Sequence, residues 1–299
     1  MHGKQKKLIV VLGQTAVGKT ALSIKLAKMF NGEIVSADSR QVYKGLDIGT
    51  GKVTKKEMQG IPHHLIDVAS PKRTFTIAQY KKLAMKAIEK IFKKGKIPFL
   101  VGGSPFYLRA VIEGLEFPKV KPDWELRKKL EKLSEEKLFE MLKKIDKERA
   151  KSIDKKNKRR LIRAIEIALK TKKPVPPLKV KKPPFEILII GIKKEKEELK
   201  KLIKKRLLKR LKQGLVKEVK NLRKSGISWK RLESFGLEYK FVAQYLQGKL
   251  AYQEMVEKLQ KEIEKFAKRQ MTWFKKFKNI HWIKTEKEAK KLVDSFLNN

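Results

Sequence analysis

The sequence predicts an α/β fold, in which a P-loop NTPase-like core with a mainly parallel sheet carries an inserted helical domain. Three observations predict it. Short apolar runs alternate with helical patterns along most of the chain, which is typical of a parallel sheet. Residues 13–20 read Gly-Gln-Thr-Ala-Val-Gly-Lys-Thr, which is the G-x-x-x-x-G-K-[ST] pattern of a phosphate-binding loop. Residues 119–182 have helical patterns and no convincing strand, which sets them apart from the sheet.

The phosphate-binding loop is the first element, and the residues around it fit its role. An apolar run at 8–12 precedes it and a helix-like stretch at 21–27 follows it, as the motif requires. Backbone N–H groups of the loop and the N-terminal end of the helix can surround an anion. Lys19 adds a full charge, and the Thr20 hydroxyl can hold Mg²⁺. The motif therefore predicts a site for a pyrophosphate or polyphosphate.

The rest of the sheet is predicted from five further apolar runs. They lie at 33–36, 64–68, 98–101, 185–192 and 280–283. Helical patterns lie between most of these runs, and the longest are at 77–92, 195–224 and 252–277. Strands that alternate with helices in this way indicate crossover connections, and so a mainly parallel sheet.

The chain is predicted to divide into a core in two parts, 1–118 and 183–299, and an inserted basic helical domain, 119–182. The insertion ends in proline-rich stretches at 173–177 and 181–184, which are typical of linkers. The apolar run at 185–192 then resumes the pattern of the core. A length of 299 residues is enough for one large domain or two ordinary ones.

Charge is the strongest compositional signal. Lys and Arg number 76 against 32 acidic residues, which gives a formal net charge of +44 and favours a nucleic-acid partner. Proteins from hot environments are also rich in Lys, but their charge networks need Glu in proportion. The chain has no cysteine, which excludes a disulfide scaffold and a thiolate site. No apolar stretch approaches the roughly 18 residues of a membrane span and no signal peptide precedes the first strand, so we expect a cytoplasmic protein.

Asp38 follows the second predicted strand, within the stretch Ser-Ala-Asp-Ser-Arg-Gln-Val-Tyr at 36–43. The carboxyl ends of parallel strands form the ligand crevice, on the same side as the phosphate-binding loop. A carboxylate there can take a proton from a nucleophile or lie near Mg²⁺. Asp and Ser are also favoured helix N-caps, so a capping role stays open.

A second glycine motif, Gly102-Gly103-Ser104, follows the predicted strand at 98–101. Two glycines allow a ligand or an adjoining loop to approach the backbone closely. This strand does not end in the acidic residue with which many P-loop NTPases hold Mg²⁺. Asp67 is another candidate for that acid, but the sequence does not place its strand next to the first one. The interpretation as a motor-type ATPase is therefore weakened.

Two further stretches carry arginines in informative positions. At helical spacing Arg159, Arg163 and Glu166 share one face, which suits the phosphates of a nucleic acid, although a solvated surface face is the alternative. Arg206 falls on the same face of a predicted helix as Leu199, so we expect it to point inward. An inward arginine needs an anionic partner, either a bound pyrophosphate or a structural carboxylate.

The helical pattern at 266–274 includes Gln270 and Trp273 in its apolar stripe, which indicates core packing. Stacking of its aromatic residues on a splayed base is the alternative. His63 and His64 lack a third ligand at metal-binding spacing and are interpreted as structural.

Together these residues resemble the tRNA dimethylallyltransferases, also called tRNA isopentenyltransferases. The resemblance covers nearly the whole chain and rests on residues 13–20, 38–50, 61–67, 102–104 and 268–273. The most specific of these is 38–50, which reads Asp-Ser-Arg-Gln-Val-Tyr-Lys-Gly-Leu-Asp-Ile-Gly-Thr. A short Gly-Tyr motif of the family has only a loose match at 234–240, and Ser104 stands where Thr is commoner.

The resemblance implies transfer of a dimethylallyl group from dimethylallyl pyrophosphate to N6 of adenosine 37 in tRNA. Asp38 would be the general base and Thr15 a second catalytic residue, with Mg²⁺ on Thr20 neutralising charge. The residues implied for the pyrophosphate are Gly13, Thr15, Ala16, Val17, Gly18, Lys19, Thr20 and Arg206. Those implied for tRNA are Asp38, Ser39, Arg40, Gln41, Ser104, Arg127, Arg159, Arg160, Leu161, Ile162 and Arg163. The implied partners are the tRNA anticodon stem-loop and the donor, with no membrane and a monomeric protein.

Three other functions keep some support from the residues. A relative that prenylates free adenine nucleotides would use the P-loop and Asp38 but would have no use for 119–182. A small-molecule kinase would bind ATP at Lys19 and an acceptor hydroxyl near Asp38. An RNA-binding switch that only senses a nucleotide would keep its function after loss of Asp38, whereas a transferase would bind but not turn over.

Overall fold

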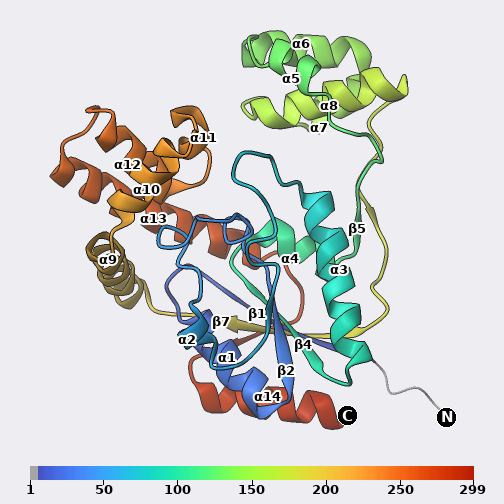
Figure 1. The fold of residues 1–299 in the computed structure, drawn as a ribbon. Helices are drawn as coiled ribbons and strands as arrows, with labels where there is room; N and C mark the ends of the chain where they lie inside the picture. The colour runs from blue at the N-terminus through green and yellow to red at the C-terminus, as the bar shows by residue number, and fades with distance from the viewer. Residues whose placement is uncertain (1–5) are drawn as a thin grey trace. The chain divides into compact units, whose positions relative to one another are not determined.

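The computed structural model describes residues 6–299, and it divides into two compact units (Figure 1). Unit 1 comprises the chain up to Gly114 together with Lys182–Asn299, and unit 2 comprises Leu115–Lys181. The sequence predicts the insertion at 119–182. Unit 2 starts at Leu115 because the short strands β5 (Leu115–Glu116) and β6 (Lys179–Val180) pair antiparallel within it. β6 lies inside the predicted insertion, which was expected to hold no strand, whereas β5 lies just before it.

Unit 1 is built on a six-stranded sheet with the order β3-β2-β4-β1-β7-β8. Every neighbouring pair is parallel, which confirms the predicted sheet. The strands are β1 (Lys7–Gly13), β2 (Gly32–Ser36), β3 (His63–His64), β4 (Ile97–Gly102), β7 (Glu186–Ile192) and β8 (Ile280–Ile283). Residues 8–12 of β1 are fully buried, because β1 lies inside the sheet and helices cover it.

The predicted strand at 64–68 is mostly wrong. β3 contains only His63 and His64, because Leu65 and Asp67 adopt φ values of 64° and 56°, which an extended strand excludes. β3 also lies at the edge of the sheet, with β2 and β4 between it and β1. Asp67 forms an ion pair with Lys52, and it is not an acid at the end of a strand that neighbours the P-loop.

The helices of unit 1 pack on the sheet and against one another (Figure 1). They are α1 (Lys19–Met29), α2 (Lys55–Met58), α3 (Ile77–Lys93), α4 (Pro105–Ile112), α9 (Lys196–Lys212), α10 (Leu215–Lys224), α11 (Trp229–Glu233), α12 (Leu237–Leu246), α13 (Tyr252–Phe274) and α14 (Glu286–Asn298). The single helix predicted at 195–224 is two helices, because Gly214 has a φ of 99° and turns the chain between α9 and α10. The two are the start of a cluster of helices that ends with α13.

Unit 2 is a small helical body with its own core. It contains α5 (Trp124–Leu130), α6 (Glu135–Ile145), α7 (Lys147–Ser152) and α8 (Lys158–Thr171). Leu138 and Leu142 of α6 pack with Leu161 and Ile165 of α8, and all four side chains are fully buried. Among the described helices of both units, none is long and apolar enough to cross a membrane.

Candidate functional site

The P-loop connects β1 to α1 as the sequence predicts. β1 ends at Gly13 and α1 begins at Lys19, so residues 14–18 form the loop between them. Gly18 directly precedes the helix with a φ of 90°, a left-handed conformation that glycine adopts without strain. Ala16 lies in the loop, and the Val17 side chain is buried, so Val17 can offer a ligand only its backbone. The loop and the first turn of α1 together present the N–H groups of an anion site.

Lys19 is drawn toward the loop and is short of a counter-charge. Its Nζ donates to the Gln14 carbonyl oxygen at 2.6 Å. Burial lowers the pKa of Lys19 to about 7, with a further decrease from Arg206 and an opposing increase from Asp38. A bound anion would therefore favour the protonated form of Lys19.

Arg206 reaches the P-loop from α9, as its predicted inward orientation requires. Its Nη2 donates to Thr15 Oγ1 at 2.5 Å. Burial, followed by the nearby Arg210, lowers the pKa of Arg206 to about 9. The carboxylate that could neutralise it, Glu238, instead accepts a hydrogen bond from Arg210 Nη1 at 2.7 Å. Two poorly neutralised cations, Lys19 and Arg206, thus converge on one loop.

Asp38 follows the end of β2, and the two oxygens of its carboxylate differ in their hydrogen bonds. Oδ1 accepts the backbone N–H groups of Arg40 at 2.8 Å and Gln41 at 3.3 Å. No hydrogen bond from the described residues reaches Oδ2. The residues that follow Asp38 form turns and no helix, so Asp38 is not a helix cap. One oxygen is therefore held by the turn while the other is available for a proton.

The other residues predicted around Asp38 lie together at the ends of β2 and β4. Ser104 Oγ accepts the Ser39 N–H at 3.0 Å and donates to Ser39 Oγ at 3.3 Å. Gln41 Nε2 donates to the Gly51 carbonyl oxygen at 3.2 Å. Arg40 lies in the same turn and is partly buried. The predicted positions 38–41 and 104 therefore form one continuous surface of unit 1.

The arginines predicted in unit 2 form two groups, those that pair with a buried carboxylate and those that are exposed. Arg127 and Arg163 both form ion pairs with the fully buried Glu166, Arg127 at 2.6 Å. Burial raises the pKa of Glu166, but hydrogen bonds from Arg127, the Asp123 backbone and Arg163 outweigh it and bring the pKa below its usual value. These two arginines help to hold unit 2 together.

The remaining predicted positions of unit 2 lie at the start of α8. Arg159 and Arg160 are exposed, whereas Leu161 and Ile162 are buried in the core of the unit. The α8 periodicity turns the side chains of Leu161 and Ile162 into the core of the unit, so only their backbone is left for contact with a tRNA, and such contact at these two positions stays a prediction.

The chain offers Mg²⁺ few ligands of its own. Thr20 lies in the first turn of α1 and is exposed. Over residues 6–299 no group of three His, Cys, Asp or Glu side chains could hold a metal ion. Mg²⁺ commonly keeps several waters and binds through phosphate oxygens with one or two protein groups. The Thr20 hydroxyl fits such a shared site, and a cage made of protein groups alone does not.

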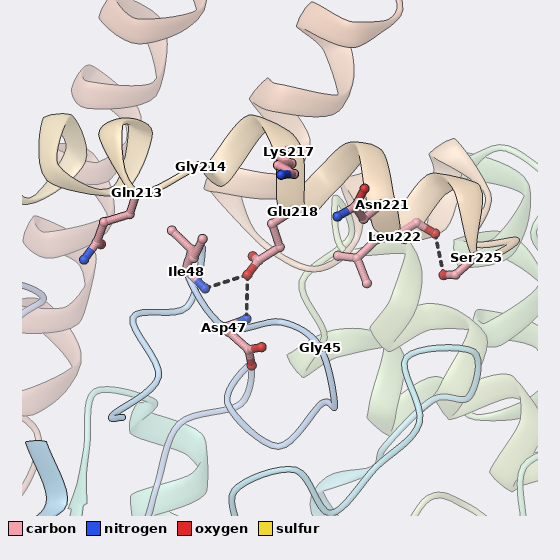
Figure 2. Close-up of a pocket in the computed structure, with 10 residues that line it drawn as sticks. All are labelled: Gly45, Asp47, Ile48, Gln213, Gly214, Lys217, Glu218, Asn221, Leu222 and Ser225. Carbon is pink, nitrogen blue, oxygen red and sulfur yellow. Dashed lines mark hydrogen bonds between the residues drawn. The ribbon is translucent and has the colours of Figure 1, made fainter. Parts of the chain in front are cut away.

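A separate cavity of about 440 Å³ lies between the loop at 45–48 and α10 (Figure 2). Glu218 Oε2 accepts the N–H groups of Asp47 at 3.0 Å and Ile48 at 2.7 Å, and Oε1 accepts the Gly49 N–H at 3.1 Å. Tyr239 adds a hydrogen bond from its OH to Glu218 Oε1 at 2.7 Å. Neither the P-loop nor Asp38 lines this cavity, and its main feature is the support that Glu218 gives to the loop.

Three residues that hold loops of unit 1 in place are not among the predicted site residues. The apolar stripe predicts core packing for Gln270, whereas its side chain also contacts the P-loop. Tyr239 lies in the loosely matched stretch 234–240, and Glu218 lies in a helix full of charges. The one signal for Gln270 was a glutamine on an apolar helical stripe, and Glu218 had no signal in the sequence.

Comparisons with known proteins agree on one family. A family model described as IPP transferase matches residues 41–277. A tRNA dimethylallyltransferase of Acetivibrio thermocellus is 44% identical over 284 residues, which cover 92% of this chain and 91% of the relative. A tRNA dimethylallyltransferase of Pelotomaculum thermopropionicum is 41% identical over 294 residues, which cover 96% and 94% of the two chains.

Solved structures give the same result. The tRNA isopentenylpyrophosphate transferase of Bacillus halodurans has a TM-score of 0.74 and 35% identity, with 98% of this chain and 97% of that chain covered. A eukaryotic dimethylallyltransferase acting on tRNA has a TM-score of 0.84 and 28% identity, with 98% and 80% covered. The likeness thus extends over nearly all of the chain.

Proposed function

The chain belongs to the family of tRNA dimethylallyltransferases, and from that membership we propose that it transfers a dimethylallyl group from dimethylallyl pyrophosphate to N6 of adenosine 37 in tRNA. The observation that carries this proposal is the convergence of Lys19 and Arg206 on the P-loop, with the single carboxylate of Asp38 close to both. Such a site pairs a cradle for a pyrophosphate with a proton acceptor.

The P-loop holds the leaving group of the donor. The backbone N–H groups that follow Thr15 in the loop and in the first turn of α1 surround the pyrophosphate, and Lys19 and Arg206 neutralise its charge. The Thr20 hydroxyl would hold Mg²⁺, and the bound ion would supply positive charge against the negative charge that grows on the pyrophosphate. Thr15 lies in the loop, and its hydroxyl is held by the hydrogen bond from Arg206.

The reaction exchanges one bond for another at the allylic carbon of the donor. N6 of the adenine forms a bond to this carbon while the bond from the carbon to the pyrophosphate oxygen breaks, and pyrophosphate leaves. Asp38 takes the proton that N6 loses, through the oxygen that the turn leaves available. Ser39, Arg40, Gln41 and Ser104 line the approach to Asp38 and contact the nucleotide.

Unit 2 binds the phosphates of the anticodon stem. Arg159 and Arg160 are exposed and so can pair with phosphate oxygens, whereas Arg127 and Arg163 shape the unit through Glu166. The target adenine leaves its stack to reach Asp38, because chemistry on a base requires its edge to be free. We further propose that the protein acts as a monomer in the cytoplasm, together with its tRNA substrates.

Two rivals lose support from particular residues. An ATP-using kinase would benefit from an acid at the end of the strand next to β1, but β4 ends at Gly102. A prenylating enzyme for free nucleotides would have no use for unit 2.

The test is a transfer assay with dimethylallyl pyrophosphate that carries a radiolabel in its allylic group, Mg²⁺ and unmodified tRNA, with AMP and ATP as parallel acceptors. We expect label in tRNA, and its loss when adenosine 37 is replaced. Label in AMP alone would assign the chain to nucleotide prenylation, and no label in any acceptor would contradict the proposed transfer.

A further inference from the structure

We propose that Gln270 is a positioning residue that fixes Thr15 and Gly103 for the pyrophosphate of the donor, an inference that rests on the proposed function. Gln270 lies on α13, near the end of the helix. Its Oε1 accepts the Thr15 N–H at 2.8 Å, and its Nε2 donates to the Gly103 carbonyl oxygen at 2.6 Å. One side chain therefore joins the P-loop after β1 to the glycine motif after β4.

The amide of a glutamine is the group that both partners require. The Thr15 N–H needs an acceptor and the Gly103 carbonyl needs a donor, so only one orientation of the amide serves both. The side chain is 3% exposed, so water cannot replace these bonds easily. An apolar residue of the same size would leave a buried donor and a buried acceptor without partners.

Because Gly103 has no side chain, the amide group of Gln270 can occupy the space beside it. A Cβ atom on Gly103 would lie 2.7 Å from Gln270 Nε2 and 3.5 Å from Lys19 Nζ. The first distance is too short for non-bonded atoms, so an alanine at 103 would displace the amide. The space beside Gly103 therefore adjoins both the Gln270 amide and the ammonium group of Lys19, the cation that neutralises the pyrophosphate in the proposed function.

A second contact from the same helix strengthens the argument. Gln14 Nε2 donates to the Ala267 carbonyl oxygen at 2.9 Å, and the Gln14 side chain is also buried. Two successive residues of the P-loop, Gln14 and Thr15, are therefore tied to one turn of α13. With Arg206 on its hydroxyl and Gln270 on its N–H, Thr15 is held through its side chain and through its backbone. The loop is thereby arranged before a donor arrives, which reduces the entropy lost on binding.

The variant that tests this role is Gln270→Leu, which keeps the size of the side chain and removes both hydrogen bonds. We expect the affinity for inorganic pyrophosphate with Mg²⁺, measured by calorimetry, to fall about tenfold. The KM for dimethylallyl pyrophosphate should rise by about the same factor, while the KM for tRNA stays unchanged. Hydrogen exchange should be faster at the Thr15 amide. A role in helix packing alone would lower the active fraction, and so kcat, and leave both KM values as they are.

Two further variants keep the test decisive. Gly103→Ala displaces the amide without altering Gln270, so it should weaken pyrophosphate binding in the same direction, and it decides the matter if Gln270→Leu does not fold. Gln260→Leu is the matched control, because Gln260 lies on the same helix and its side chain donates to Glu264. We expect wild-type binding for it.

The proposal is overturned if a folded Gln270→Leu or Gly103→Ala variant binds pyrophosphate as tightly as the wild type. Because pyrophosphate binding is measured without transfer, the two proposals can fail separately. A wild-type protein that transfers no label, with weakened pyrophosphate binding in the Gln270→Leu variant, would contradict the proposed function and support the positioning role.

Discussion

Arg206 donates a hydrogen bond to the hydroxyl of Thr15, and this contact joins two residues that are 191 positions apart. It brings α9 to the P-loop and places a guanidinium beside Lys19. Arg210, one turn further along α9, takes the carboxylate of Glu238, so Arg206 has no carboxylate partner among its hydrogen bonds in the described residues. The two arginines therefore have different roles. Arg210 stabilises the fold through Glu238, whereas Arg206 is available to pair with a bound anion.

We predict that Arg206→Ala weakens pyrophosphate binding about tenfold to a hundredfold, since a hydrogen bond to a charged group is lost. Arg206→Lys should be intermediate, because lysine keeps the charge but not the planar fork. Calorimetry with pyrophosphate and Mg²⁺ measures both. Unchanged affinity in Arg206→Ala would mean that Arg206 serves only to fix Thr15.

Arg160→Ala is expected to weaken tRNA binding and to lower its salt dependence. Loss of one phosphate contact should reduce the slope of log K against log salt by about one. The control is Lys287→Ala on α14, an exposed position outside the proposed interface, which should leave the slope unchanged. Filter binding at several salt concentrations gives the slopes, and equal slopes for Arg160→Ala and the wild type would leave Arg160 as a surface charge.

Glu166→Gln should destabilise unit 2. Glu166 is fully buried between Arg127 and Arg163, and removal of one partner from a buried ion pair costs about 3 kcal/mol. Hydrogen exchange in residues 115–181 reports the loss, and pyrophosphate binding by unit 1 should be unaffected. Glu148→Gln, which breaks an exposed pair with Lys151, should cost less than about 1 kcal/mol. Equal effects of the two substitutions would contradict the role given to Glu166.

Glu33 should make the free energy of unfolding depend on pH in the acid range. Its carboxylate is fully buried, and although burial alone would raise its pKa, bonds from Lys94, His64 and Lys96 lower the pKa from 4.5 to about 2. A lowered carboxyl pKa stabilises the folded state above pH 4.5, and this contribution disappears as the pH falls towards 2.

In the Glu33→Gln variant the free energy of unfolding should therefore fall less steeply below pH 4.5 than in the wild type. Urea denaturation followed by circular dichroism measures the two curves. The exposed Glu286, which pairs with Lys25, offers the control substitution Glu286→Gln, whose curve should follow the wild type. Parallel curves for Glu33→Gln and the wild type would show that Glu33 does not carry this dependence.

The sequence predicts the sheet well and the contacts across it poorly. Buried parallel strands such as β1 and β7 are continuous apolar runs, so their positions can be predicted from local pattern alone. β3 is short because Leu65 and Asp67 adopt left-handed backbone, and nothing in an apolar run indicates this. The break at Gly214 has a local signal, the glycine itself, although helical periodicity continues on both sides.

The residues of the site also differ in how well the sequence predicts their contacts. Lys19 and Asp38 lie in or beside recognisable motifs directly after strands, so topology predicts that they converge. Gln270 and Glu218 reach their partners across 255 and 171 residues, and such contacts depend on how the helices pack. The family resemblance names Leu161 and Ile162 together with their neighbours, but a motif does not indicate which of its side chains are buried, as these two are.

The most direct test of the central claim is the rate of the chemical step in Asp38→Ala, measured in a single turnover with donor and tRNA already bound. Our account predicts a decrease of about a hundredfold or more, the usual effect of losing a general base, with tRNA and pyrophosphate affinities close to those of the wild type. A wild-type rate for the bound complex would contradict the assignment of Asp38 as the base.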